Sequence, residues 1–277
     1  MSLFKAASTV SLLTLASRIT GLVRDLLMAS VFGVNGLTDA FNVAFRIPNL
    51  LRRLFAEGAF SQAFVPVLAR SRASTGDAVT RQLIDAVATV LAWVLVAVTV
   101  LGIVAAPALV WALASGLDGP SFDAGVLMTR WMFPYIGCMS LVALSAGILN
   151  TWRHFAVPAA TPVLLNLAMI LAAWLGAPWL ARKGVEPIYA MAGGVLVGGL
   201  LQLAVQVPAL ARLGLLPRIG LRPARVRAAW RDAGVRQVLT LMLPALLGVG
   251  VAQLSLLINT QIASHLAAGS VTWVWYA

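Results

Sequence analysis

Charged residues are scarce in this sequence. Asp, Glu, Lys and Arg together make up 10% of its 277 residues, whereas hydrophobic residues make up 61%. An average soluble domain carries roughly 25% charged residues. This deficit excludes an ordinary soluble domain. It predicts an all-α polytopic membrane protein, because helices satisfy their own backbone hydrogen bonds within lipid.

Cysteine and histidine are almost absent. Cys138 is the only cysteine and lies in an apolar run, which excludes an intrachain disulfide and a cysteine-based metal site. His154 and His265 are far apart and lack the spacing of metal ligands, so we expect structural or interfacial roles for them. The sequence predicts no metal ion and no cofactor.

Catalytic motifs are missing as well. The chain has no Walker-type glycine-rich loop, no HExxH, no GxSxG and no paired-aspartate metal motif. The run GGVLVGG at 193–199 is apolar and lies within a predicted span, where a phosphate-binding loop is not expected. These absences indicate that the protein is not an enzyme. Without a nucleotide site, transport would be driven by a gradient or by the membrane potential.

Long hydrophobic segments, by contrast, are abundant. Seven of them reach the length of about 20 residues that a transmembrane helix needs, and an eighth begins near Ser270. Ala190, Gly194 and Gly198 place small residues on one face of the sixth segment, which predicts close helix packing. The predicted spans are residues 6–32, 38–69, 82–114, 124–150, 157–181, 187–212 and 237–266.

Basic residues orient these spans. The net charge is +11, and most basic side chains fall in segments on one side of the membrane, as they do in cytoplasmic loops. We therefore predict a cytoplasmic N-terminus, and we do not expect nucleic acid as a partner. The predicted outer segments hold only Arg182 and Lys183, while the predicted inner segments hold Lys5, Arg70, Arg72, Arg81, Arg153, Arg212, Arg218, Arg222, Arg225, Arg227, Arg231 and Arg236.

The predicted spans divide the chain into three parts. Residues 1–212 form an N-terminal transmembrane lobe of six helices, and residues 237–277 form helix 7 and the beginning of helix 8. Residues 213–236 form a basic cytoplasmic connection whose arginines and Trp230 suit a short amphipathic helix on an anionic leaflet. A simple anchor between two halves of a transporter is favoured for this connection over a regulatory lipid sensor, and both interpretations stay open.

Ionisable residues inside the first two spans are the strongest functional signal. A charged side chain at the bilayer centre costs about 2.5–3.5 kcal/mol even on the mildest scale. Several of them are therefore expected to face a water-filled cavity. They lie in segment 17–66 and comprise Arg18, Arg24, Asp25, Asp39, Arg46, Arg52, Arg53 and Glu57.

Two interpretations of these charges compete. Helical spacing places Ser17, Gly21 and Arg24 on one face of the first span. In one interpretation, pairs such as Arg24–Asp25 and Arg53–Glu57 neutralise one another and lock the helices together. In the other, the excess arginine binds an anionic, phosphorylated cargo, since the planar guanidinium recognises phosphate oxygens in pairs. We favour the cargo interpretation.

The second span carries a polar stripe of Arg46, Asn49, Arg53 and Glu57.

Several segments match a known family. SRITGLVRD at 17–25 and TDAFNVAFRIPNLLRRLFAEGAFSQAFVPVLA at 38–69 resemble the MurJ/MviN lipid II flippases of the multidrug/oligosaccharidyl-lipid/polysaccharide exporter superfamily. GILNTWRHFAVPAATPVLLN at 147–166 and INTQIASHLAAGSVTWVWYA at 258–277 are similar to later segments of the same proteins. The resemblance extends over essentially the whole chain.

The resemblance implies a MATE-like transporter of two lobes around a central cationic cavity, working by alternating access. Its cargo would be lipid II, an undecaprenyl-diphosphate-linked disaccharide-pentapeptide that is moved from the inner to the outer leaflet of the bacterial inner membrane for peptidoglycan synthesis. The phospholipid bilayer and cell-wall synthesis proteins would be further partners. The resemblance assigns substrate binding to Arg18, Arg24, Arg52 and Arg53, and gating or charge pairing to Asp25, Asp39 and Glu57.

Relatives continue beyond the residues that match Tyr276 and Ala277. The resemblance therefore implies the N-terminal six-helix lobe plus helix 7 and the start of helix 8, and we expect an incomplete fragment. An exporter of another anionic lipid-linked glycan or of a drug, an enzyme acting on polyprenyl phosphates and a non-transporting scaffold of cell-wall synthesis are the alternatives.

Overall fold

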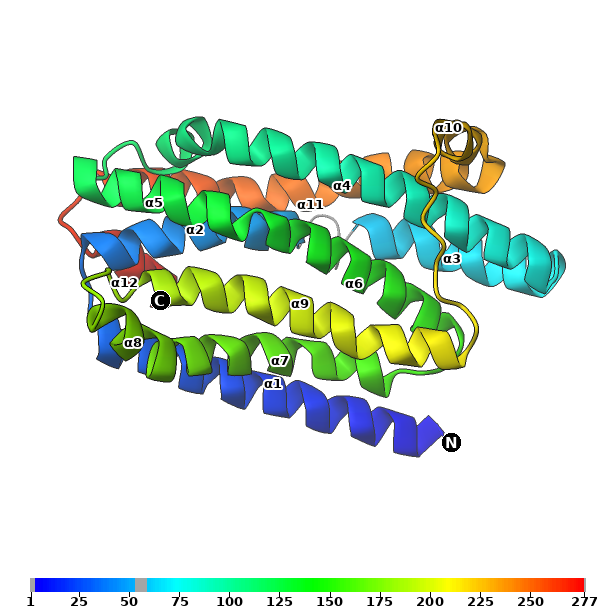
Figure 1. The fold of residues 1–277 in the computed structure, drawn as a ribbon, viewed down its shortest axis with the longest axis horizontal. Helices are drawn as coiled ribbons and strands as arrows, with labels where there is room; N and C mark the ends of the chain where they lie inside the picture. The colour runs from blue at the N-terminus through cyan, green and yellow to red at the C-terminus, as the bar shows by residue number, and fades with distance from the viewer. Residues whose placement is uncertain (1–2, 53–58, 277) are drawn as a thin grey trace.

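The computed structural model describes residues 3–52 and 59–276. Every regular element in these ranges is a helix, and Figure 1 shows them stacked side by side along one long axis. The elements are α1 (Leu3–Phe32), α2 (Gly36–Arg52), α3 (Phe60–Ser74), α4 (Asp77–Ala114), α5 (Gly119–Met132), α6 (Pro134–Thr151), α7 (Ala156–Leu171), the π-helical turn η2 (Ala172–Gly176), α8 (Ala177–Ala181), α9 (Tyr189–Arg212), α10 (Pro223–Arg231), α11 (Ala233–Ser264) and α12 (Ser270–Tyr276).

Four helical segments of the described chain are long and apolar enough to cross a membrane. They correspond to the third, fourth, fifth and sixth predicted spans. The first and seventh predicted spans fall on α1 and α11, whose 30 and 32 residues exceed the length needed to cross a bilayer. The predicted span 38–69 falls on α2 and α3, with residues 53–58 outside the described ranges. The four segments are Asp77–Ala114, Gly119–Thr151, Ala156–Ala181 and Tyr189–Arg212.

The fourth predicted span consists of two helices. α5 ends at Met132 and α6 begins at Pro134, with Phe133 between them. Proline lacks the N–H that would continue the helical ladder and is favoured in the first turn of a new helix. The hydrophobic run continues through this point, which is why hydrophobicity predicted a single span.

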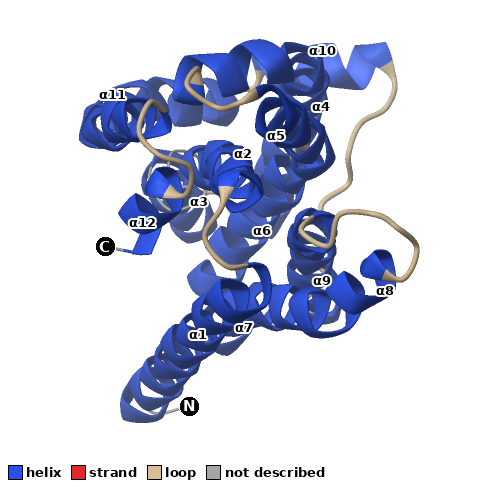
Figure 2. Cartoon of the chain, turned by 90° about the vertical axis from the view of Figure 1, so that its left-hand side faces the viewer, coloured by secondary structure: helices blue, strands red, loops and turns tan. Residues whose placement is uncertain are grey.

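The helices form two groups. In the end-on view of Figure 2, α1, α7, α8 and α9 lie on one side, and α2, α4, α5, α11 and α12 lie on the other. α1 packs along α7, α7 along α9, and α9 along α6, while α2 packs on α5 and α4 contacts α5, α6 and α11. α9 contacts α5 directly and also packs on α6, which joins the two groups, and α1 lies at the far edge of its own.

Small residues bring α7 and α9 close together, as the sequence predicts. A Cβ added to Gly194 would lie 2.6 Å from Ala172 Cβ, and one added to Gly198 would lie 2.7 Å from Leu165 Cδ1. Real side chains do not approach that closely, so no larger residue fits without a shift. The backbones of α7 and α9 therefore touch where these glycines lie.

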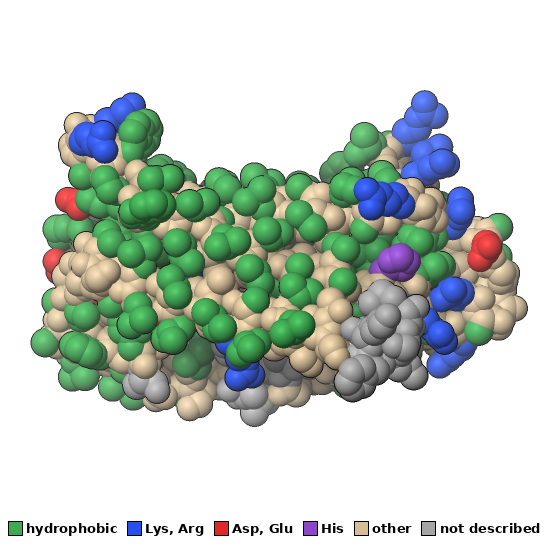
Figure 3. All heavy atoms as spheres, turned by 90° about the horizontal axis from the view of Figure 1, so that it is seen from below, with side chains coloured by type: hydrophobic (Ala, Val, Ile, Leu, Met, Phe, Trp, Pro, Cys, Tyr) green, Lys and Arg blue, Asp and Glu red, His purple; other side chains and the backbone are tan. Residues whose placement is uncertain are grey.

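The predicted inner segments lie together at one end of the molecule. The N-terminus, the α3–α4 and α6–α7 connections and α10 share one end in Figure 1, and the α1–α2, α4–α5 and α11–α12 connections share the other. Figure 3 shows hydrophobic side chains over most of the face between the ends, with Lys and Arg gathered mainly toward the ends. The alternation of spans agrees with the charge pattern. Which end is cytoplasmic stays a prediction.

The basic connection contains one short helix. α9 ends at Arg212, α10 covers Pro223–Arg231 and α11 begins at Ala233. These bounds lie close to the predicted limits at 213 and 236. The division into a first lobe, a connection and the start of a second lobe stays a prediction.

Candidate functional site

A cavity of about 500 Å³ lies between the two groups of helices. Its wall is built by α1, α2, α3, α6, α7, α9 and α12, so residues from both ends of the chain meet there. One part of the lining is polar or basic, and another is aromatic or aliphatic. The polar part comprises Ser17, Arg18, Arg24, Asn49, Ser61, Thr161, Asn166 and Gln202, and the apolar part includes Phe45, Met139, Val142, Leu165 and Trp275.

The face predicted on the first span borders this cavity. Ser17, Gly21 and Arg24 all line it, together with Arg18. Their spacing of three, four and seven residues stacks them along α1. The space beside Gly21 is open, because a Cβ added there would have only Asn166 Nδ2 within 4 Å, at 3.5 Å. The structure thus confirms the predicted face and brings Arg18 and Arg24 to one wall.

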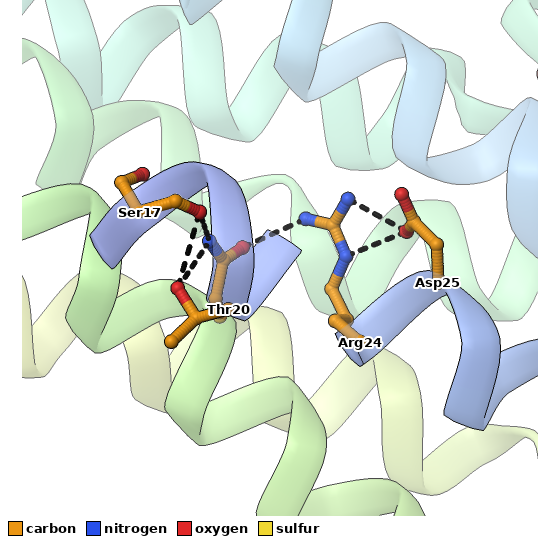
Figure 4. A network of polar contacts seen from close by, with 5 residues as sticks. Ser17, Thr20, Arg24 and Asp25 are labelled. Carbon is orange, nitrogen blue, oxygen red and sulfur yellow. Dashed lines mark hydrogen bonds and ion pairs between the residues drawn. The ribbon is translucent and has the colours of Figure 1, made fainter. Parts of the chain in front are cut away.

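Arg24 is held by partners on two helices (Figure 4). Its Nε donates to Asp25 Oδ1 at 2.9 Å, and its Nη2 lies 2.7 Å from the same oxygen. Its Nη1 donates to Asn166 Oδ1 at 3.0 Å, across to α7. The Arg24 side chain is 16% exposed. The predicted Arg24–Asp25 pair is therefore present, and Asn166 is a third member that the sequence did not predict.

Asn166 is itself fixed in orientation. Its Nδ2 donates to the Ser17 backbone carbonyl at 2.9 Å and to Thr20 Oγ1 at 3.2 Å. Both acceptors are on α1, so the amide oxygen is left to face Arg24 (Figure 4). A single side chain of α7 thus makes three contacts to α1. This arrangement sets the direction in which the Arg24 guanidinium points.

Arg18 adds positive charge to the same wall. Its side chain is exposed and lines the cavity. Within the described ranges, Arg24–Asp25 is the one ion pair, so no described carboxylate neutralises Arg18. Because Asp25 offsets one of the two arginines, the α1 wall keeps a net positive charge among the described residues.

Asp39 lies away from the cavity wall and contacts α12. Its Oδ2 accepts a hydrogen bond from the Gly269 N–H at 2.6 Å. Its Oδ1 accepts from the Thr272 N–H at 2.7 Å and from the Thr272 hydroxyl at 2.6 Å. The carboxylate is buried, and these three donors satisfy it without a cation. Asp39 therefore joins α2 to the start of α12.

The predicted stripe on the second span is only partly visible. Asn49 lines the cavity. Arg46 is buried, with its guanidinium 5.3 Å from the Trp275 ring centre and Nη1 donating to the Leu256 carbonyl at 3.4 Å. Arg52 ends α2 with its side chain outside the described part, and Arg53 and Glu57 also lie outside the described residues.

The cavity includes residues that the sequence did not mark as functional. Besides Asn166, they include Thr161, Gln202 and Trp275. The Gln202 Nε2 donates to the Thr161 carbonyl at 2.9 Å, which joins α9 to α7 beside the cavity. The sequence signal that could have found Asn166 and Gln202 is a carboxamide side chain in an otherwise apolar span.

No group of three His, Cys, Asp or Glu residues that could hold a metal occurs in the described ranges.

Comparison with known proteins places this architecture in a family. The family described as "Lipid II flippase MurJ" matches residues 28–277. The chain is 54% identical over 279 residues to the lipid II flippase MurJ of Burkholderia cenocepacia, with 100% of this chain and 53% of that protein covered. It is 43% identical over 284 residues to the probable lipid II flippase MurJ of Vibrio cholerae, with 99% and 52% covered.

A solved structure shows the same fold. It is described as "Lipid II flippase MurJ, inward closed conformation", and it superposes with a TM-score of 0.78 at 24% identity. The alignment covers 96% of this chain and 53% of that one. The chain thus spans about half the length of the relatives that it matches. The family match covers most of the chain, and this multi-pass membrane protein belongs to the MurJ lipid II flippase family.

Proposed function

We propose that this chain forms the N-terminal lobe of a lipid II flippase, which moves the undecaprenyl-diphosphate-linked precursor of peptidoglycan from the inner to the outer leaflet by alternating access. The observation that carries the proposal is the cavity of about 500 Å³ with Arg18 and Arg24 in its wall. Membership of the MurJ family supports the choice of cargo and a transporter rather than an enzyme.

The geometry of Arg24 suits a diphosphate. A guanidinium has five N–H donors, and the contacts to Asp25 and Asn166 use one hydrogen on each of its three nitrogens. Two donors, on Nη1 and Nη2, remain for cargo oxygens. Arg18 supplies a second guanidinium, and bidentate charge-assisted bonds to phosphate oxygens are among the strong polar contacts in proteins. The diphosphate would therefore bind along the α1 wall.

The apolar part of the wall suits a cargo with a lipid tail. Phe45, Met139 and Trp275 line the same cavity as the arginines. A lipid-linked glycan needs a polar surface for its head group and an apolar surface for its first isoprenoid units. Both surfaces occur within one cavity.

The remaining assignments extend this proposal. Arg52 and Arg53 would bind the cargo with Arg18 and Arg24, and Glu57 would pair with a neighbouring arginine. Asp39 would serve gating, because its bonds to α12 would have to break if α12 moved away from α2. The protein would reside in the bacterial inner membrane with a cytoplasmic N-terminus, and cell-wall synthesis proteins would be further partners.

The proposal is tested in cells depleted of their own flippase. The full-length form of the protein would be expressed as wild type and as Arg18→Ala, Arg24→Ala and Arg70→Ala variants, and leaflet-specific labelling would measure lipid II translocation. Arg70 is exposed on α3 and does not line the cavity, so it is the matched control. We expect roughly tenfold or greater losses for Arg18→Ala and Arg24→Ala, as for lost charge-assisted bonds, and normal activity for Arg70→Ala.

Normal translocation by both cavity variants at normal abundance would show that the cavity assignment is wrong.

A direct measurement of cargo binding separates cargo recognition from transport. The purified chain would be titrated with lipid II and with another undecaprenyl-diphosphate-linked glycan. Equal affinity for both would favour the alternative of a broader exporter of lipid-linked glycans.

A further inference from the structure

The connection between α9 and α11 has exposed arginines that the cavity does not use. Residues 213–236 include α10 and lie at the end of the molecule that also holds the N-terminus (Figure 1). We call its arginines the basic surface. All of them are exposed, and they are Arg218, Arg222, Arg225, Arg227, Arg231 and Arg236.

Three side chains of α4 hold this connection in place. Asp85 Oδ1 accepts from the Arg218 backbone N–H at 2.8 Å. Thr89 Oγ1 accepts from the Gly220 N–H at 2.9 Å, and Trp93 Nε1 donates to the Gly220 carbonyl at 3.0 Å. Asp85, Thr89 and Trp93 are four residues apart and therefore share one face of α4. The segment before α10 is fixed along that face.

α10 is fixed at its other end as well. Ala229 is buried against the core that includes α4 residues. Asp232 follows α10 directly, and its Oδ1 accepts from the backbone N–H groups of Gly234 and Val235 at 2.9 and 3.1 Å, which caps α11. Such a cap typically stabilises a helix start. The arginines of the basic surface thus project from a backbone held on both sides.

The positive charge of this surface is not neutralised by described carboxylates. Asp85 and Asp232 line a hollow together with Arg218 and Arg225, and both accept hydrogen bonds from backbone N–H groups. Neither forms an ion pair with an arginine, since the one ion pair in the described ranges is Arg24–Asp25. Clustered cations of this kind beside membrane spans attract anionic lipid headgroups.

Exposed apolar side chains lie among the arginines. Leu221 is 77% exposed and Trp230 is 43% exposed, and Leu216 and Ile219 are also exposed. Arginines and Trp230 lie on the short helix α10, and Leu221 lies just before it, a combination typical of segments that lie in the membrane interface. Trp favours the headgroup level, where its ring is half in apolar surroundings.

Two hollows beside the connection could receive headgroup phosphates. One, of about 430 Å³, has Arg81, Arg218 and Asp85 as its charged lining residues. The other, of about 310 Å³, has Arg218, Arg225, Asp85 and Asp232 as its charged lining residues. Arg218 borders both, so adjacent anionic groups would share it. Each hollow offers two guanidinium groups, and its carboxylates already accept hydrogen bonds from backbone N–H groups.

We propose that residues 213–236 form a docking surface for anionic phospholipid headgroups, which the basic surface binds while Leu221 and Trp230 enter the apolar edge of the bilayer. This inference does not depend on the identity of the transported cargo. Because the connection is bonded to α4 and continues into α11, bound lipid would hold both helices at the interface.

The test measures lipid binding by the full chain. The chain, purified in a neutral detergent, would be titrated with phosphatidylglycerol or phosphatidylcholine, and bound lipid would be counted by native mass spectrometry. The test variant is Arg222→Gln/Arg225→Gln/Arg227→Gln. The control Arg70→Gln/Arg182→Gln/Lys183→Gln removes the same charge from exposed positions elsewhere.

Each basic residue near an anionic leaflet contributes a factor of about five in binding. We expect the wild type and the control to prefer phosphatidylglycerol, and the test variant to lose affinity for it on the order of a hundredfold. Equal phosphatidylglycerol binding by the test variant and the control would overturn the proposal. Competition by millimolar inorganic phosphate would also overturn it, since that outcome indicates a site for free phosphate.

A further variant separates charge from folding. Arg222→Lys/Arg225→Lys/Arg227→Lys keeps the charge, so it should retain the preference for phosphatidylglycerol and its dependence on salt. Loss of binding in this variant, with unchanged circular dichroism, would contradict an electrostatic surface. An unchanged circular dichroism spectrum of the glutamine variant would show that its lost binding is not a loss of fold.

Discussion

Asp39 and Thr272, 233 residues apart in the chain, share two hydrogen bonds in the buried interior. The Thr272 hydroxyl and N–H donate to the Asp39 Oδ1 at 2.6 and 2.7 Å. The Gly269 N–H donates to the other carboxylate oxygen. The first turn of α12 is thereby closed by a side chain from α2. A buried carboxylate is normally costly, and here three donors offset that cost.

Replacing Asp39 by Asn should loosen the α2–α12 contact. The amide keeps one acceptor oxygen but turns an NH2 group toward a backbone donor, which leaves buried groups unsatisfied at a cost of about 1–3 kcal/mol. Faster amide hydrogen exchange at 271–275 would report the loss. Thr272→Val removes only the hydroxyl and should have the smaller effect. Unchanged exchange in Asp39→Asn would mean that these bonds do not hold α12.

Replacing Asn166 by Ala should weaken cargo binding although both arginines of the α1 wall are kept. Arg24 would lose its partner on α7 and keep only Asp25, so its remaining donors would no longer be held toward the cavity. We expect lipid II affinity to fall about tenfold, in line with a hydrogen bond to a charged group.

Titration of the purified chain with lipid II would measure this effect. Asn150→Ala is the matched control, because Asn150 is an exposed asparagine near the end of α6 and does not line the cavity. If Asn166→Ala and Asn150→Ala bind lipid II equally well, Asn166 has no positioning role.

Adjacent glycines on α9 offer a controlled test of the α7–α9 contact. A methyl group at Gly194 would lie 2.6 Å from Ala172 Cβ and 3.3 Å from the Ala168 carbonyl oxygen, whereas one at Gly193 meets nothing within 4 Å. Gly194→Ala should destabilise the chain by about 1–3 kcal/mol through overpacking. Gly193→Ala should be neutral or slightly stabilising, because alanine favours helix. Thermal unfolding in detergent compares the two, and equal midpoints would contradict close packing at Gly194.

Local features of the fold were predictable from the sequence. Long apolar runs predicted the spans, and a spacing of three and four residues predicted that Ser17, Gly21 and Arg24 share a face. Small residues at positions 190, 194 and 198 predicted a close contact of α9 with a neighbouring helix. These features depend on residues near one another in the chain, where helix geometry alone determines the arrangement.

Long-range partners were not predictable in the same way. The Arg24–Asn166 bond joins residues 142 apart, and no pattern in one sequence names the partner of a single amide. For the same reason the partners of Asp39 on α12 were not foreseen. Of the predicted stripe, Asn49 lines the cavity, whereas the Arg46 guanidinium packs near Leu256 and near Trp275, a residue of the cavity wall. Tertiary packing decides which polar residues of α2 reach the cavity.

The attachment of α1 along α7 has a mechanical consequence. α1 packs on α7 and η2, and Asn166 bonds α1 at three points, Ser17, Thr20 and Arg24. α7 in turn contacts α9 at glycines where no larger side chain fits without a shift. A force on the Arg24 side chain would therefore act on α1, α7 and α9 together. An anion bound at this wall would then move these three helices as one unit rather than bend a single helix.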